Sequence, residues 1–162
     1  MSPMSKGLAS FAVAAALSSP AGAQVLTQKN VSLAMAQAIA NAAIVKCQSM
    51  GFKVSVTVLD RDGLAVVMLR GDGAGLHTPE GSDRKAYTAR AYSAPSAVFA
   101  KRVQSEPNYV PAKQYSRVLG LAGGLPIKVG NEVIGAVGVS GSPGKDDVCS
   151  QAGIDKVADQ LK

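Results

Sequence analysis

The sequence predicts an α+β fold, a single domain in which helices flank an antiparallel sheet. In two places, an apolar or alternating segment of strand length is followed by a turn signal of Asp, Asn or Gly and then by a second apolar segment. This pattern is typical of β-hairpins. Apolar residues at helical spacing precede the first hairpin, separate the two hairpins and follow the second. The order of elements is therefore helix, hairpin, helices, hairpin, helix.

The first predicted helix runs from Thr27, as its N-cap, to about Met50, with Gly51 as the stop signal. Its apolar residues form two stripes on opposite sides: Val31, Met35, Ala38, Ala42 and Val45 on one, and Leu33, Ala36, Ala40, Ile44 and Cys47 on the other. A helix that is apolar on both sides is expected to be covered twice, by the sheet and by another helix or subunit.

The first predicted hairpin follows this helix. Residues 52–59 alternate, so that Val54, Val56 and Val58 share one face of the strand and Ser55 and Thr57 the other. A turn at 60–63 leads to a returning strand over 64–69.

The remaining elements are assigned from turn and stop signals. A helix is expected from Ser82 or Asp83 to Ser93, a further helical piece from Ser96 to Val103, and a short helix around 113–119 after two prolines. The second hairpin pairs 125–129 with 132–139. After a loop over 140–145, Asp146 or Asp147 caps a final helix whose buried stripe is Ile154, Val157, Ala158 and Leu161.

Residues 1–23 have the three-part layout of a secretory signal peptide. Lys6 supplies the positive charge, Leu8 to Leu17 is an uncharged apolar run, and Ala21-Gly22-Ala23 fits the small-residue rule for cleavage. A membrane anchor is the alternative, but about ten apolar residues are too few to span a bilayer. We therefore expect a mature domain of residues 24–162 that is periplasmic or secreted and has no membrane span.

Cys47 and Cys149 are the only cysteines. In an exported chain they form either one disulfide or two buried thiols, and their spacing does not decide between these. A bridge would close a loop of about 100 residues, which the chain-entropy account values at up to ~4–5 kcal/mol.

The positive charge of the chain is concentrated in residues 83–117, which carry seven basic and two acidic residues. The formal net charge of +6 becomes +5 without Lys6, so this segment accounts for the whole excess. Such a cluster indicates an anionic ligand or partner. Nucleic acid is disfavoured, because there is no Trp, aromatic residues are 4% of the chain, and no nucleic-acid-binding motif is present.

His77 is the only histidine, and it lies in a long glycine-rich loop before a basic helix. A surface or hydrogen-bonded histidine without a function is one interpretation. The other is a ligand to the iron of haem, whose propionates pair with Arg or Lys. The cations near this loop in the sequence are Arg70, Arg84, Lys85 and Arg90.

Two other motifs fail on inspection. Gly138 to Asp146 (GVSGSPGKD) resembles a phosphate-binding loop, but Val139 and Asp146 stand where that motif requires Gly and Ser or Thr. A serine hydrolase would have His77 as its only base, and no G-x-S-x-G segment accompanies it. No constellation demands turnover, so the sequence leaves open whether the protein is an enzyme.

Four segments carry a resemblance to the GlcG/HbpS-like family, which includes the C-terminal domain of PduO-type proteins. They are VTVLDRDG (56–63), LRGDGAG (69–75), RKAYTA (84–89) and GLPIKVGNEVIGAVGVSG (124–141), the last followed by the helix start at 149–153. The resemblance covers 26–161. It implies an α/β sandwich, assembly into dimers up to octamers, and haem binding, with haem degradation or iron binding in some members and corrinoid-related roles in others.

In the family, either threonine or histidine serves as the haem ligand, and His77 and Thr78 both stand in the loop in question. We predict an exported, oligomeric haem-binding protein that sequesters or senses haem, with His77 on the iron and Arg70, Lys85 and Arg90 at the propionates. Slow haem breakdown would follow from an exposed iron edge. The alternative is an accessory or sensor module that binds an organic acid or a corrinoid without ligating iron.

Overall fold

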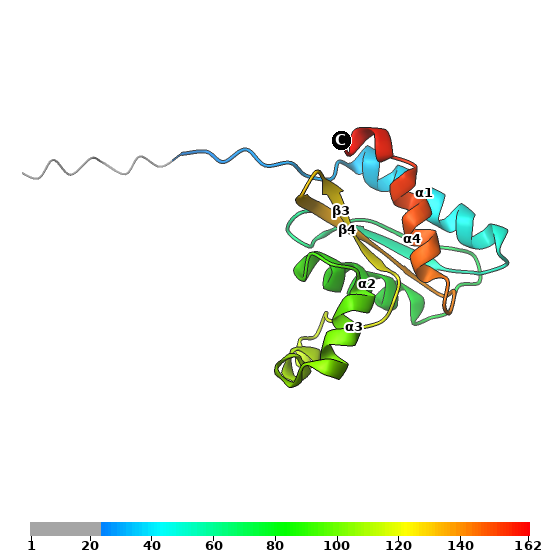
Figure 1. Ribbon diagram of the computed structural model, residues 1–162. Coiled ribbons are helices and arrows are strands. Elements are labelled where there is room, and N and C mark those ends of the chain that lie inside the picture. Colours follow the sequence, from blue (N-terminus) through cyan, green and yellow to red (C-terminus); the bar gives the residue numbers. More distant parts are fainter. Residues whose placement is uncertain (1–23) are drawn as a thin grey trace, which may run out of the picture.

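A computed structural model describes residues 24–162, and the predicted signal peptide, residues 1–23, lies outside the described residues. One four-stranded antiparallel sheet forms the centre, in the order β2-β1-β4-β3 (Figure 1). Its strands are β1 (Ser55–Leu59), β2 (Ala65–Arg70), β3 (Gly124–Val129) and β4 (Glu132–Ser140). Each predicted hairpin is present, and the pairing of β1 with β4 joins the two hairpins into one sheet. The predicted α+β class and antiparallel sheet are confirmed.

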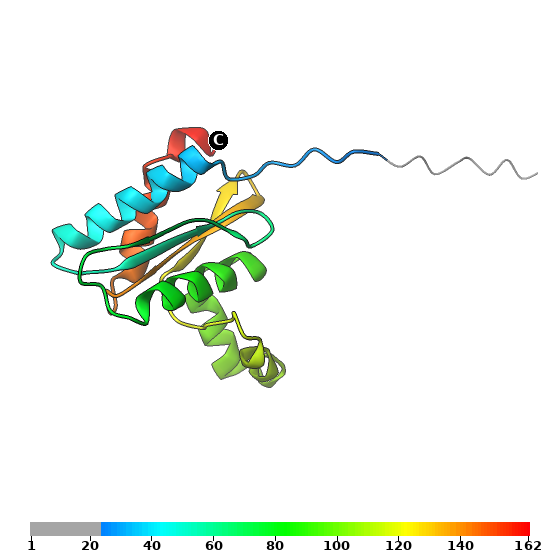
Figure 2. The ribbon, with the colours of Figure 1, turned by 180° about the vertical axis from the view of Figure 1, so that it is seen from behind.

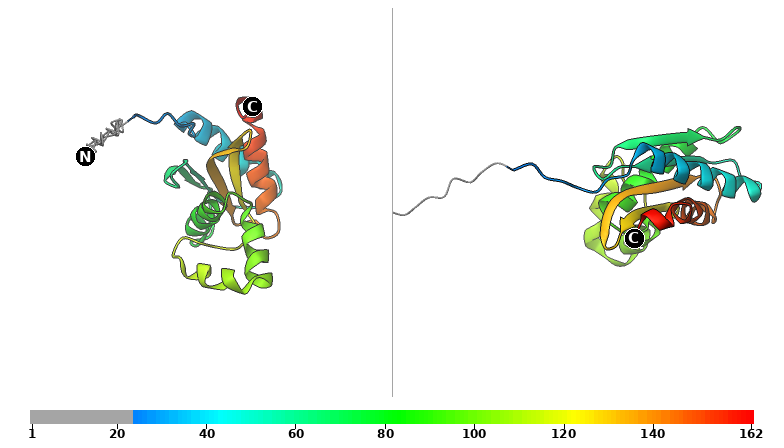
Figure 3. Two further views of the ribbon diagram at one scale, coloured as in Figure 1. Left: turned by 60° about the vertical axis from the view of Figure 1, so that its left-hand side comes forward. Right: turned by 90° about the horizontal axis from the view of Figure 1, so that it is seen from above.

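Helices cover both faces of this sheet, as the two opposite views show (Figures 1 and 2). The helices are α1 (Leu33–Ser49), α2 (Thr78–Ala91), α3 (Ser96–Ser105) and α4 (Asp146–Asp155), with 3₁₀ turns η1 (Pro107–Gln114) and η2 (Ala158–Gln160). α1 and α4 lie side by side on one face, and α2 lies on the other. α3 and η1 extend beyond α2, away from the sheet (Figure 3). No helix within residues 24–162 is long and apolar enough to cross a membrane.

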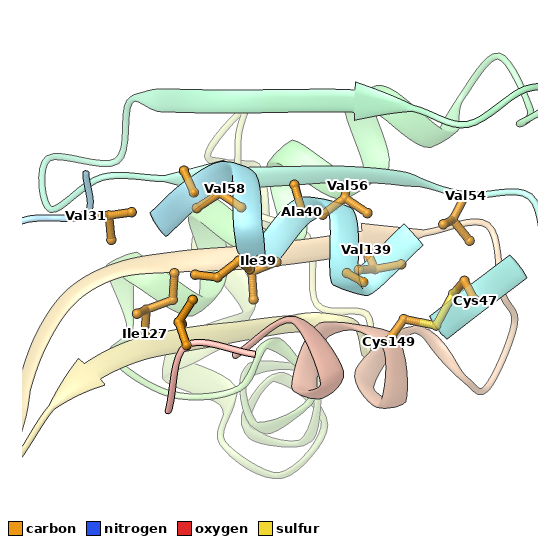
Figure 4. Packing of buried hydrophobic residues seen from close by; sticks show 14 of the residues in the cluster. Val31, Ile39, Ala40, Cys47, Val54, Val56, Val58, Ile127, Val139 and Cys149 are labelled. Carbon is orange, nitrogen blue, oxygen red and sulfur yellow. A yellow bond between two sulfur atoms is a disulfide. The ribbon is translucent and has the colours of Figure 1, made fainter. Parts of the chain in front are cut away.

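β1 is buried on both faces, although its sequence alternates between apolar and hydroxyl side chains. Val56 and Val58 belong to the main core under α1 and α4 (Figure 4). The hydroxyl groups on the other face are also enclosed, because α2 covers them. Ser55 Oγ lies 2.8 Å from Thr78 Oγ1, and Thr57 Oγ1 lies 2.8 Å from Ser82 Oγ. The polar face of the strand is therefore a buried row of hydroxyl pairs that fixes α2 on the sheet.

α2 approaches the sheet closely because Gly138 in β4 has no side chain. A Cβ atom at this position would lie 2.1 Å from the Ser82 carbonyl oxygen and 2.6 Å from the Ala86 nitrogen. Neither backbone atom can move without shifting the helix, so a larger residue here would force α2 off the sheet.

The start of α1 corrects the prediction. The helix begins at Leu33 and not after Thr27, because Ser32 is its N-cap and accepts a hydrogen bond from Met35 N (3.2 Å). The preceding chain is held non-helical by the side chain of Asn30, whose Oδ1 accepts from both Val31 N and Arg61 N. Val31 itself is buried in the core. Tertiary contacts thus override a plausible capping signal.

Neither predicted stripe of α1 is fully buried. Ala36, Ala40 and Cys47 of the second stripe face the core, but Leu33 of that stripe is 57% exposed, and Val45 of the first stripe is 62% exposed. Further along the chain, α2 begins four residues earlier than Ser82, and a 3₁₀ turn over 107–114 replaces the expected helix over 113–119. α4 begins at Asp146, but its N-cap is Lys145 and not Asp146 or Asp147 as predicted.

Cys47 and Cys149 form a disulfide, which settles the alternative that their spacing leaves open. The bridge joins α1 to α4 at one end of the core, with both cysteines fully buried and their Cα atoms 5.6 Å apart (Figure 4). The two helices that cover the same face of the sheet are therefore also linked covalently.

Candidate functional site

His77 stands at the N-cap position of α2, where the glycine-rich loop meets the helix. Its side chain is exposed and makes no capping hydrogen bond, so the imidazole nitrogens are not used to cap the helix. It lies against Gly75, where a Cβ atom would come within 2.9 Å of the imidazole Cε1. The absence of a side chain at Gly75 therefore gives the imidazole its place. Pro79 in the first turn has a backbone conformation suited to starting the helix.

His77 lines a cavity of about 560 Å³, here called the histidine cavity. It lies between the start of α2, the loop that links β4 to α4, and the segment before β3. Its other lining residues are Lys53, Gly75, Thr78, Lys85, Leu121, Ala122, Ser140, Gly141, Pro143, Gly144 and Asp146. The volume falls in the range typical of small-molecule and cofactor sites.

A buried ion pair lies in the wall of the histidine cavity. Lys85 is only 4% exposed, and its Nζ donates to Asp146 Oδ2 (2.6 Å) and to the Val139 carbonyl oxygen (3.2 Å). An ammonium group has three N–H donors, so one is left over among the partners in residues 24–162. Lys85 thus carries a fixed positive charge with spare donor capacity at the cavity.

Asp146 holds this lysine and the cavity loop together. While Oδ2 accepts from Lys85, Oδ1 accepts from Ser142 N (2.9 Å) and Ser142 Oγ (2.6 Å). The carboxylate also lies in the first turn of α4, where the helix dipole favours a negative charge. The loop therefore keeps its shape through one carboxylate that has three partners.

Lys53 is a second cation of the cavity, and the sequence analysis missed it. It precedes β1, and its neighbour Gly141 passes so close that a Cβ atom there would lie 2.6 Å from the Lys53 carbonyl oxygen. Gly141 also has φ +125°, a conformation that favours glycine. The signal in the sequence was weak, because Lys53 lies outside the basic segment and reaches the cavity only through the pairing of β1 with β4.

The structure brings only some of the predicted site residues together. His77 and Lys85 line one cavity. Arg70 instead donates through Nε and Nη2 to the Ala74 carbonyl oxygen and braces the loop from outside the cavity lining. Arg90 lies at the far end of α2, where its Nε donates to the Arg61 carbonyl oxygen (2.6 Å). The helix length that separates Arg90 from His77 keeps the two from binding one ligand.

The Thr78 side chain lines the histidine cavity, but its hydroxyl group is already used. Oγ1 donates to the Gly75 carbonyl oxygen and shares a hydrogen bond with Ser55 Oγ, both at 2.8 Å. The residue is 1% exposed. The two loop residues that the sequence offers as ligands therefore differ: the imidazole is free to bind, whereas the hydroxyl group has a structural role.

Within residues 24–162, no group of three or more His, Cys, Asp or Glu side chains is arranged to hold a metal ion. The histidine cavity offers one imidazole, the Lys53 ammonium, the Lys85–Asp146 ion pair and apolar surface from Leu121, Ala122 and Pro143. These groups together can take a flat apolar molecule that carries anionic groups and has one position open to a nitrogen ligand.

Comparison with known proteins places the chain in a family. Residues 31–155 match the model of the family described as "Haem degrading protein HbpS-like". An uncharacterised 15.0 kDa protein of Citrobacter freundii, from the dhaT–dhaS intergenic region, is 31% identical over 119 residues, which are 72% of this chain and 84% of that protein.

Solved structures agree with this match. A double mutant of HbpS from Streptomyces reticuli is 35% identical, with a TM-score of 0.77 over 88% of this chain and 97% of the other. PduOC, solved as a haem complex, has a TM-score of 0.70 over 78% of this chain and 94% of its own, but at 24% identity that likeness shows the fold alone. The predicted resemblance is confirmed, and the chain belongs to the HbpS-like family.

Proposed function

We propose that the protein binds haem in the histidine cavity and is exported to do so. The observation that carries this proposal is the free imidazole of His77 at a cavity that also holds two cations, Lys53 and Lys85. An imidazole nitrogen is the ligand that haem iron takes in many proteins. Ammonium groups pair with the two propionates. In this assignment Lys53 replaces Arg70 and Arg90, which the structure places elsewhere.

The residues present fit the apolar part of haem as well as its charges. Leu121 in the cavity lining is 56% exposed, and Ala122 and Pro143 add apolar surface beside it. Large apolar side chains exposed around a cavity are costly unless a ligand or partner covers them. A macrocycle ligated by His77 would cover such surface, so the apolar rim and the imidazole suit the same molecule.

The family match and the haem complex of PduOC support this proposal, the first through descent and the second through a shared fold. Bound haem would supply a redox-active iron. The residues of this chain would bind and orient it: His77 at the iron, Lys53 and Lys85 at the carboxylates, and Asp146 holding Lys85 in place. No side chain of the cavity is set up as a dedicated base, so sequestration or sensing suits the site better than rapid turnover.

A haem titration of residues 24–162 tests the proposal. We expect a saturable Soret shift at one haem per chain that is lost in His77→Ala and restored by added imidazole, because the free base can occupy the emptied position. The comparison is Thr78→Val, which removes the hydroxyl group but keeps the imidazole, so a saturable Soret shift should persist in protein that remains folded by circular dichroism. A wild-type spectrum without a saturable shift would contradict haem binding and favour an organic acid or corrinoid ligand.

Removing single positive charges tests whether Lys53 or Arg90 pairs with the haem propionates. Lys53→Gln should weaken haem binding by about two- to five-fold, the effect of losing one partly exposed ion pair. Arg90→Gln is the matched control and should leave the affinity unchanged, because Arg90 lies at the other end of α2. The dissociation constants from Soret titrations at fixed ionic strength measure this. Equal losses in both variants would count against the cavity as the site.

Two features support export. One is the signal-peptide layout of residues 1–23, and the other is the Cys47–Cys149 disulfide, which persists in oxidising compartments. We expect the protein recovered from the periplasm or medium of a bacterial host to begin at Gln24. Intact-mass measurement of the protein and its amino-terminal peptide checks this. A chain that keeps Met1 and stays in the cytoplasm would contradict export.

We also propose assembly with other copies, because α1 keeps a partly apolar face that no other helix or strand of residues 24–162 covers. Ala38, Ala42 and Val45 line a shallow groove there, together with Asn41, Lys46, Ser49 and Lys156. Small side chains allow another helix to approach closely. Light scattering at micromolar concentration should give a mass that is a multiple of the monomer, and Ala42→Glu should lower it. A monomeric wild-type protein would contradict assembly.

A further inference from the structure

A second cavity, of about 400 Å³, lies on the side of α2 away from the sheet, and is here called the lateral cavity. Its lining comes from α3, from Arg84 in α2, and from η1 and the segment that returns from η1 to β3. Its lining residues are Arg84, Phe99, Ala100, Val103, Gln104, Lys113, Val118, Leu119, Gly120 and Leu121. It shares only Leu121 with the histidine cavity.

The walls of the lateral cavity are mostly apolar. Phe99 and Val118 are buried, and Val103 and Leu119 are half-buried on opposite sides. Gly120 brings the returning segment close to α3, since a Cβ atom there would lie 3.1 Å from Phe99 Cδ1. The aromatic ring is held from behind by Tyr92, with ring centroids 4.5 Å apart. The cavity therefore has a fixed hydrocarbon floor and not a collapsible gap.

The only charged residues that line the lateral cavity are two cations, Arg84 and Lys113. The Arg84 guanidinium is held in place, since Nη2 donates to the Val118 carbonyl oxygen and Nη1 to Glu80 Oε1, both at 3.1 Å. Glu80 is 74% exposed, so this pair is weak and easily exchanged. Arg84 Nε is enclosed and has no partner within residues 24–162, and Lys113 forms no ion pair there.

We propose that the lateral cavity binds an amphipathic carboxylate, a hydrocarbon body with a single anionic end. The hydrocarbon would pack on Phe99, Val103 and Leu119, and the carboxylate would pair with Lys113 and with the Arg84 guanidinium. Apolar burial supplies affinity, and a carboxylate on a fixed guanidinium supplies orientation. Lys113, a lining cation without an ion pair in residues 24–162, lies beside an apolar floor, so an anionic end on a hydrocarbon body would supply the missing counter-charge.

The lateral cavity is a different site from the histidine cavity, although a smaller pocket includes residues of both, among them His77 and Arg84. Its lining lacks an imidazole, and its two cations belong to α2 and η1 and not to the loops around His77. Leu121 lines both cavities, so a ligand in either one is expected to shift the amide signal of this residue. Failure of haem binding would leave this proposal standing, and the reverse also holds.

Octanoate is the probe for this site, with octanol and acetate as matched ligands that lack either the charge or the hydrocarbon. In amide NMR titrations of residues 24–162, we expect saturable shifts for octanoate confined to residues 84, 99–104 and 118–121. Octanol and acetate should bind at least about ten-fold more weakly, since each loses one of the two contributions. Shifts centred on His77 and Lys53, or equal binding of octanol, would overturn the proposal.

Variants of the chain test the same point without relying on ligand chemistry. Ala100→Phe fills the cavity from α3 and should abolish the octanoate shifts, whereas His77→Ala should bind octanoate as the wild type does. Lys113→Gln should weaken octanoate binding about two- to five-fold. The control Lys101→Gln removes an exposed lysine of α3 that does not line the cavity and should change nothing. Equal affinity in Ala100→Phe and wild type, both folded, would refute the site.

Discussion

Asp146→Ala is expected to lower the free energy of unfolding by about 3–5 kcal/mol, because it leaves the buried Lys85 ammonium without its counter-charge. The same change removes the acceptor of Ser142 N and Ser142 Oγ, which are also buried. Urea unfolding followed by circular dichroism measures the loss.

The control for this experiment is Asp155→Ala, at the end of the same helix. Asp155 is exposed and accepts one hydrogen bond from Gln151 Nε2, so its loss should stay within about 0.5 kcal/mol. Adding Lys85→Met to Asp146→Ala should recover part of the stability, because the isolated charge is then gone. Equal stability of the Asp146 and Asp155 variants would show that the ion pair is not what holds this loop.

Removal of the disulfide is the second large effect. Cys47→Ala together with Cys149→Ala opens a loop with a sequence separation of 102, and the chain-entropy account then predicts a loss of about 4–5 kcal/mol. The unfolding midpoint in urea should fall accordingly and should no longer respond to reductant, whereas the wild type should lose stability when reduced. A double variant as stable as the oxidised wild type would mean that the bridge adds nothing to the packing of α1 on α4.

The fold was largely predictable because the signals for the strands and their turns lie between residues that are close in sequence. The alternation of Val54, Val56 and Val58 and the turn signals of both hairpins depend on neighbouring residues. The start of α1 was not predictable in this way. Asn30 caps the turn at Arg61, a contact across the chain that overrides the signal at Thr27. Burial of the serine and threonine face of β1 was equally hidden, since only the position of α2 makes it necessary.

The site was predictable in part, for the same reason. His77 stands out because it is the only histidine and follows a glycine-rich loop. Its cationic partners depend on three-dimensional proximity, and nearness in sequence selected Arg70 and Arg90, which do not line the histidine cavity. Lys53 reaches the histidine cavity through the pairing of β1 with β4. Lys85 lines it because it lies on α2 and is bound by Asp146. Sequence neighbours of a loop are thus a poor guide to what lines a cavity.

The arrangement also accounts for the difference between His77 and Thr78 as ligands. A side chain can bind a ligand only with a group that the fold has not already used. The Thr78 hydroxyl group forms hydrogen bonds with Ser55 Oγ and with the Gly75 carbonyl oxygen. The bond to Ser55 holds the start of α2 on β1. The neighbouring imidazole is thereby held at the cavity on a rigid helix end, which is the kind of support that a metal ligand needs.

Because His77 is the only histidine, labelling all histidine with ¹⁵N labels a single site in protein prepared without a histidine tag. Pulsed electron paramagnetic resonance of the ferric haem complex then reports directly on what the iron touches. The account predicts a ¹⁵N hyperfine coupling from one imidazole nitrogen bound to iron, present only in histidine-labelled protein. Stoichiometric haem binding without any ¹⁵N coupling would show that the iron is held by another group and would contradict the assignment.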